Sequence, residues 1–108
     1  MRDERVWKAL ADPTRRDILD LLREAPQTTG QVAAHFTMTR FGVMKHLAVL
    51  QGAGLLRVER RGRERWNHLN PLPIQRLWRR WVRPFEAAAA DKLLRIESAT
   101  LRNPRAKS

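Results

Sequence analysis

The chain has 108 residues and a mass of 12.6 kDa, with 43% apolar and 31% charged residues, the composition of one ordinary globular domain. Lysine and arginine outnumber aspartate and glutamate by 22 to 11, for a net charge of +11, and so large an excess indicates an anionic partner such as nucleic acid. Cysteine is absent, which excludes a disulfide framework, a cysteine nucleophile and thiolate metal sites.

Two helices are predicted in the first part of the chain. Apolar residues with helical spacing predict the first over residues 3–11. Asp12 is a good N-cap for the second, because Pro13 then occupies the first helical position, where a missing N–H costs nothing. The apolar residues expected to face the core of this second helix are Ile18, Leu21, Leu22 and Ala25.

A short helix and a longer one follow closely. Thr28 and Gln31 have the spacing of a capping box and predict a helix over residues 29–36. Thr39 is the predicted N-cap of a helix over residues 39–52, which ends where glycines appear. The residues expected to face the core in this helix are Val43, Leu47 and Leu50, at i, i+4 and i+7.

After this helix the apolar spacing changes from the helical period to alternation. Residues 55–60 alternate, Gly62 marks a turn, and residues 64–70 form a second strand-like stretch. We expect a two-stranded β-hairpin with Trp66 and His68 on one face of its second strand.

The last part of the chain is predicted to be helical. Its apolar residues have helical spacing: Ile74, Leu77, Trp78, Trp81, Val82 and Phe85. Because Pro84 disfavours helix at the residue before it and removes a hydrogen bond, we expect a kink or two helices meeting near Arg83. An alanine-rich stretch continues the helical pattern to residue 101.

This order of elements is the pattern of a winged helix-turn-helix, and here the chain resembles the ArsR family of bacterial winged-helix repressors. The resemblance covers residues 4–101 and rests on KALADPTRRDILDLL at 8–22, TTGQVAAHF at 28–36, VMKHLAVLQGAGLL at 43–56 and RRGRERWNHL at 60–69. The later stretch LWRRWVRPFE is similar to the metal-free branch of the family. The resemblance implies a homodimer that binds an inverted repeat and represses transcription.

The expected fold class is mainly α with a small β-hairpin wing. We expect a single winged helix-turn-helix domain over residues 1–108. Residues 3–72 would form the DNA-binding core, with the wing at residues 55–70, and residues 73–101 would form C-terminal dimerisation helices.

The helix at residues 39–52 is the predicted recognition helix, because its inward residues leave its N-terminal part exposed to a major groove. Arg40 is suited to guanine, and Lys45 to guanine or a phosphate, whereas Phe41 stands where the family usually places a polar residue. His46 either binds a phosphate or braces the helix. The candidate DNA contacts are Thr39, Arg40, Phe41, Met44, Lys45 and His46; the alternative is a solvated helix face.

The hairpin carries a second set of candidate DNA contacts. These are the arginines Arg60, Arg61, Arg63 and Arg65. Gly62 at the tip allows the backbone to approach phosphates or a minor groove closely. The alternative is a charged edge that only prevents aggregation between strands.

Apolar side chains on the first and last helices are the predicted dimer surface. They are Val6, Trp7, Trp78, Trp81, Phe85, Leu93 and Ile96. The spacing of the two tryptophans follows the apolar stripe, which favours packing over a ligand cage. Whether they also line a groove for a small effector stays open at this stage.

No metal, cofactor or enzymatic activity is expected. The three histidines lie at 35, 46 and 68, spacings that place no two of them as ligands on one helix face. Glycine-rich phosphate loops and a serine with a histidine partner are also missing. We expect double-stranded DNA and a second copy of the chain as partners, no membrane, and a cytoplasmic location. The alternative function is an RNA-binding or protein-interaction module without operator specificity.

Overall fold

The computed structural model describes residues 2–102, and its side chains are described for residues 3–86 and 92–97. The chain divides after Gln75 into two units. The first unit carries the helix-turn-helix and the wing, and the second carries the C-terminal helix.

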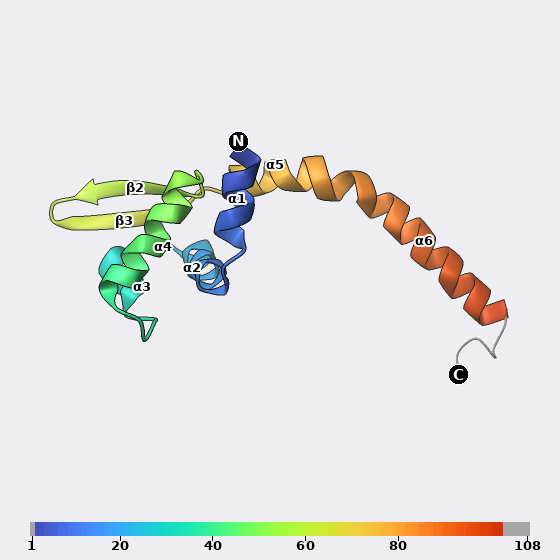
Figure 1. Ribbon diagram of the computed structural model, residues 1–108, viewed down its shortest axis with the longest axis horizontal. Helices are drawn as coiled ribbons and strands as arrows, with labels where there is room; N and C mark the ends of the chain where they lie inside the picture. The colour runs from blue at the N-terminus through green and yellow to red at the C-terminus, as the bar shows by residue number, and fades with distance from the viewer. Residues whose placement is uncertain (1, 103–108) are drawn as a thin grey trace. The chain divides into compact units, whose positions relative to one another are not determined.

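The first unit contains helices and one small sheet in alternation (Figure 1). Its elements are α1 (Arg2–Leu10), α2 (Pro13–Glu24), β1 (Gln27–Thr28), α3 (Thr29–Ala33), α4 (Arg40–Gly52), β2 (Leu56–Arg61), β3 (Glu64–Leu69) and the start of α5 (Leu72–Leu77). The hairpin formed by β2 and β3 extends past α4 on the side where α3 lies (Figure 1). We call this hairpin the wing.

The start of α2 is as predicted, but its inward face is not. The Asp12 side chain accepts a hydrogen bond from the Arg15 backbone N–H at 3.0 Å, with Pro13 at the first helical position. The buried residues are Ile18, Leu19 and Leu22. The prediction was wrong for Leu21, which is half-buried, and for Ala25, which is exposed. The reason is that α2 contacts α1, α4 and β3, so its covered face is wider than one helical stripe.

The predicted capping box at the start of α3 is confirmed. The Thr28 backbone N–H donates to Gln31 Oε1 at 3.0 Å, and the Gln31 N–H donates to Thr28 Oγ1 at 3.1 Å. The helix ends at Ala33, earlier than the predicted residue 36. Its last turn tightens instead, because the N–H groups of His35 and Phe36 bond to carbonyls only three residues back.

The sheet has three strands in the order β1-β3-β2, whereas the sequence predicted two. Gln27 and Thr28 pair with Asn67 and Trp66 on the edge of β3 that β2 leaves free. A two-residue strand has too short a pattern to be seen in the sequence. Gly62 makes the turn of the wing with a φ of +61°, which glycine adopts without strain.

The core of the first unit collects residues from every part of it. Those with no exposed surface include Ala9, Ile18, Val32, Val43, Leu50 and Leu55. The predicted inward residues of α4 are confirmed, since Val43, Leu47 and Leu50 are all buried. Because this face is fixed, the opposite face of α4 is fixed as the exposed one.

The second unit begins at Arg76 and contains the end of α5, a π-helical segment η1 (Trp78–Val82) and α6 (Arg83–Arg102). The break expected near Arg83 takes the form of this π segment, in which the Arg83 N–H bonds to the Trp78 carbonyl five residues back. Since Pro84 has no N–H to donate, a wider turn before it keeps the chain helical.

Candidate nucleic-acid interface

The N-terminal half of α4 is an exposed surface on a firmly capped helix. The Thr39 side chain accepts a hydrogen bond from the Gly42 N–H at 3.1 Å. The predicted outward residues are exposed as expected: Arg40, Phe41, Met44, Lys45 and Ala48. Phe41 is 67% exposed, and the Lys45 ammonium lies 4.9 Å from the centre of its ring. An apolar ring and a cation are therefore presented together at the start of the helix.

His46 points in the other direction, toward the start of α2. Its Nδ1 lies 3.2 Å from a terminal nitrogen of Arg15 and 3.9 Å from a carboxylate oxygen of Asp12. A guanidinium has no acceptor, so the imidazole nitrogen accepts this hydrogen bond. Between the two roles the sequence left open for His46, this geometry favours bracing the helix.

The Arg15 side chain links three helices, a role that the sequence did not predict. Besides contacting His46, it donates to the backbone carbonyls of Lys8 and Ala9, each at 2.8 Å. It thereby joins the end of α1, the start of α2 and the middle of α4. The hydrogen bond from its backbone N–H is the main cause that holds the pKa of Asp12 below the ordinary value of 3.8.

The two faces of the wing divide the predicted arginines. Cross-strand pairing places Glu59 opposite Trp66 on one face, and Arg60 opposite Arg65 on the other. Trp66 and His68 share a face, as predicted, because they are two residues apart in one strand. The arginines of the wing therefore do not form one continuous patch.

Arg61 forms an ion pair on the face of the wing that carries Glu59 and Trp66, which we call the outer face. Its guanidinium donates twice to one oxygen of Glu59, at 2.9 and 3.1 Å, and lies 5.0 Å from the ring centre of Trp66. The same Glu59 oxygen lies 3.1 Å from His68 Nε2. Hydrogen bonds from His68 and Arg61 lower the pKa of Glu59 from its ordinary value of 4.5.

The inner face of the wing turns toward α4, and here the structure brings predicted residues of both elements together. These residues help to line a hollow of about 210 Å³ between α4 and the wing. Its full lining is Thr28, Thr29, Gly30, Arg40, Met44, Arg63, Glu64 and Arg65. We call it the wing hollow. Arg40 and Met44 come from the recognition helix, and Arg63 and Arg65 from the hairpin. Arginines of both elements thus border the same space.

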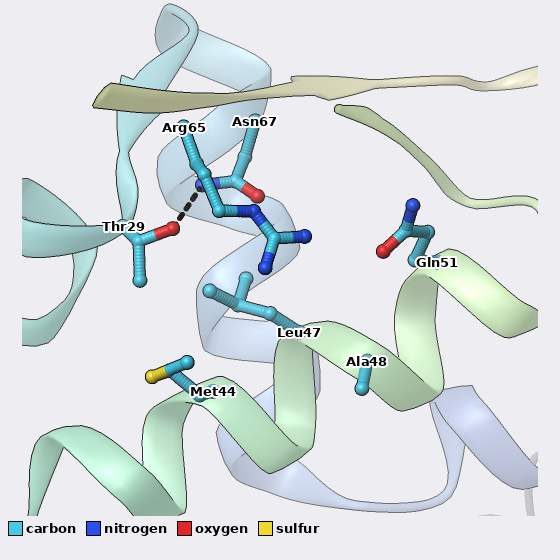
Figure 2. Close-up of a pocket in the computed structure, with 7 residues that line it drawn as sticks. All are labelled: Thr29, Met44, Leu47, Ala48, Gln51, Arg65 and Asn67. Carbon is cyan, nitrogen blue, oxygen red and sulfur yellow. Dashed lines mark hydrogen bonds between the residues drawn. The ribbon is translucent and has the colours of Figure 1, made fainter. Parts of the chain in front are cut away.

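Asn67 attaches the wing to β1 and to the start of α3, a role that the sequence did not predict. It is 1% exposed, and its Nδ2 donates to the Gln27 carbonyl and to Thr29 Oγ1, both at 3.2 Å. Figure 2 shows the bond to Thr29, with the Arg65 side chain reaching toward α4 from two residues earlier in β3. The available signal was an amide at an inward position of an alternating strand, where an apolar residue is usual.

The apolar residues predicted to form a dimer surface fall into two classes. Val6 is 3% exposed and belongs to the core of the first unit, so it presents almost no surface to a second chain. Trp7, on the neighbouring side of α1, is 47% exposed. In the second unit the exposed members are Trp78, Trp81, Phe85, Leu93 and Ile96. Arg80 lies over Trp81 and Arg83 over Trp78, at 5.2 and 5.9 Å from the ring centres.

The described residues contain neither a cluster of metal ligands nor a helix that could span a membrane. Within that part of the chain, no group of three or more histidine, cysteine, aspartate or glutamate side chains is placed to hold a metal ion. None of the described helices has the length and apolar character needed to cross a membrane.

Known proteins with similar sequences are helix-turn-helix proteins, in agreement with the fold described above. Residues 10–59 match a family model described as a helix-turn-helix domain. The chain is 39% identical to the transcriptional repressor SdpR of Bacillus subtilis over 70 residues, which are 65% of this chain and 78% of that protein.

Solved structures agree with this match. The crystal structure of an ArsR family transcriptional regulator is 30% identical and superposes with a TM-score of 0.69, covering 90% of this chain and 98% of that one. A homodimeric winged helix-turn-helix DNA-binding domain from Mycobacterium bovis is 27% identical with a TM-score of 0.64, covering 86% and 82%. The chain therefore belongs to the ArsR family of winged helix-turn-helix proteins and is a DNA-binding transcriptional regulator.

Proposed function

We propose that this protein is a homodimeric repressor that binds an inverted-repeat operator through α4 and the wing. The observation that carries the proposal is the wing hollow, where the exposed start of the recognition helix and the cationic inner face of the wing meet. A major groove would receive α4, and the wing would follow the adjoining backbone. The name of the repressor SdpR and the homodimeric state of the Mycobacterium bovis domain support the finer parts of the proposal.

Roles follow from where each side chain lies. Arg40 is the candidate for reading a guanine, because it is exposed in the first turn of α4. Lys45 contacts a phosphate or a guanine, and Phe41 and Met44 contact thymine methyl groups. Thr39 contacts a phosphate as well as capping α4. His46 supports the helix from behind.

The wing supplies contacts to the phosphate backbone. Arg60, Arg63 and Arg65 serve this purpose on the inner face and the tip, while Arg61 is held by Glu59 in the free protein. Residues 3–72 form the DNA-binding core and residues 73–101 the dimerisation helices. The division of the chain after Gln75 supports this assignment.

The dimer surface is assigned to Trp7 and to the apolar residues of the second unit. Trp78, Trp81 and Phe85 are 42%, 46% and 62% exposed, and large exposed apolar groups on neighbouring turns are typical of interaction surfaces. Two-fold symmetry would place the recognition helices about 34 Å apart, one turn of DNA. Acting on chromosomal DNA, the protein would work in the cytoplasm, with no metal and no chemical step.

The test is binding to the DNA upstream of its own gene, compared with a scrambled duplex. We expect a dimer to bind the upstream duplex at least about a thousandfold more tightly. The logarithm of the binding constant should fall with that of salt concentration with a slope of about −5 to −7, as six to eight phosphate contacts require. Equal, weak binding to both duplexes would contradict the operator-specific function and favour an RNA-binding or protein-interaction module.

A further inference from the structure

Arg65 occupies an unusual position between the wing and the recognition helix. It lines the wing hollow and also a smaller adjoining hollow of about 40 Å³, whose other walls include Leu47, Gln51 and Asn67. Figure 2 shows its guanidinium group lying between β3 and α4, above Leu47 and on the side toward Gln51. An arginine of a solvated wing would instead extend into water.

The chain does not neutralise or fully satisfy this guanidinium. Arg65 Nε is buried and has no hydrogen-bond acceptor among the described residues. No described ion pair includes Arg40, Arg63 or Arg65. A buried donor without an acceptor costs free energy, so holding Arg65 here costs the free protein stability. Because Nε has almost no accessible surface, an acceptor from outside the chain would bind the terminal nitrogens of the guanidinium.

Like charges add to this cost. Arg60 lies directly opposite Arg65 in the register of the wing, on the same face, and such a pair is destabilising. Glu59, the carboxylate next along β2, lies on the other face and bonds to Arg61 and His68. Glu64 is the carboxylate that lines the wing hollow, beside three arginines, Arg40, Arg63 and Arg65, so this side of the wing keeps a net positive charge in the free protein.

We propose that the wing hollow is the seat of one DNA backbone phosphate, held by the guanidinium groups of Arg63 and Arg65 against the first turns of α4. The inference rests on the proposed binding mode, in which this phosphate lies between the major groove that α4 enters and the minor groove beside the wing. Guanidinium groups suit phosphate oxygens because they offer paired N–H donors. The hollow, at about 210 Å³, is several times the roughly 30 Å³ that a water molecule occupies.

The seat predicts opposite effects of one substitution on stability and on binding. Arg65→Met keeps an apolar stem over Leu47 and removes the charge and the donors. The thermal midpoint of the free protein should stay the same or rise. Affinity for a random-sequence 30-base-pair duplex should fall about tenfold, as the loss of a charged hydrogen bond implies, and the salt slope should become less steep by about 0.9 per protomer.

Arg23→Gln is the matched control. It also removes one positive charge, but Arg23 is on α2, with a side chain 71% exposed and paired with Asp20. Its affinity and salt slope should remain close to those of the unchanged protein. Arg65→Gln is the second variant, in case the methionine side chain impairs folding, and it should show the same loss of binding.

The results separate this proposal from the proposed function. A lower thermal midpoint in both Arg65 variants with an unchanged salt slope would show a structural role and overturn the seat. If upstream DNA is bound specifically and the Arg65 variants bind equally well, the seat fails while the function stands. If specific binding is missing but Arg65→Met still flattens the salt slope, the seat stands without the operator.

Free phosphate is a further arm of the experiment. Inorganic phosphate at constant ionic strength should not raise the thermal midpoint of the unchanged protein, because one small anion lacks the contacts that the duplex makes elsewhere. A rise that Arg65→Met abolishes, with duplex affinity unchanged in that variant, would assign the hollow to a free oxyanion and overturn its assignment to the DNA backbone. The same rise with a loss of duplex affinity would support the backbone phosphate.

Discussion

Single side chains at the start of α4 decide which bases the protein can distinguish. Arg40 lies in the first helical turn after Thr39 and is exposed. Arg40→Ala should weaken binding to the operator by about 1–3 kcal/mol and relax discrimination at one base pair. Binding to a panel of operator duplexes, each with one base pair changed, measures this. An equal loss on all duplexes would show that Arg40 contacts only the backbone.

Asn67 is the residue that attaches the wing to the helix-turn-helix. Asn67→Ala removes the bonds to the Gln27 carbonyl and to Thr29 from a site that is 1% exposed. The free energy of unfolding should fall by about 1–3 kcal/mol, because a buried hydroxyl and carbonyl lose their donor. Urea unfolding measures this. Asn70→Ala is the control, since its bond to the Gly54 carbonyl is exposed, and a loss as large there would contradict the argument.

At the scale of elements, Arg15 holds the recognition helix in its place. Arg15→Gln removes the contact with His46 and the bonds to the Lys8 and Ala9 carbonyls. We expect unfolding free energy to fall by about 1–3 kcal/mol, because a charged donor serves three acceptors across α1 and α4. The comparison is Arg16→Gln, which removes one exposed bond to the Leu10 carbonyl. Similar urea midpoints for both variants would contradict this role.

The wing has a pH dependence that follows from Glu59. Because hydrogen bonds lower its pKa in the folded protein from 4.5, its contribution to stability is present above that value and is lost as the pH falls through the lower folded pKa. Glu59→Gln should therefore be less stable than the unchanged protein near neutral pH, and the difference should close in acid. Thermal midpoints over a pH series measure it. A difference that persists below the folded pKa would contradict the assignment.

The whole molecule functions as proposed only if two copies associate through the second unit. Trp81→Glu places a charge on an exposed apolar surface, where Trp81 is 46% exposed. Sedimentation should show one chain of 12.6 kDa in place of two. Affinity for the operator should fall by about a hundredfold or more, because the second half-site no longer binds at high effective concentration. Gln75→Glu, which adds the same charge at an exposed polar position, should remain dimeric. A dimeric Trp81→Glu would place the interface elsewhere.

The features of this protein that depend on near neighbours in the chain could be predicted from its amino-acid sequence. Thr28, Thr39 and Asp12 start their helices as predicted, because capping needs only residues two or three positions away. The inward and outward faces of α4 were also predicted, since a helix period sets them. The family was predicted from the four motifs that carry the resemblance, and the arginine excess favoured nucleic acid as the partner.

Which of the predicted residues share a site depends on how distant parts of the chain pack together. Thr29 and Asn67 meet although they are 38 positions apart, and Arg40 meets Arg65 at the wing hollow. The sequence also did not predict that β1 pairs with β3 or that Val6 is buried. Nor did it predict that Arg61 pairs with Glu59 while Arg63 and Arg65 border the wing hollow. The spacing of residues along the chain carries no information on these contacts, because each contact joins separate elements. How the elements pack depends on the burial of apolar side chains and the pairing of polar groups over the whole core.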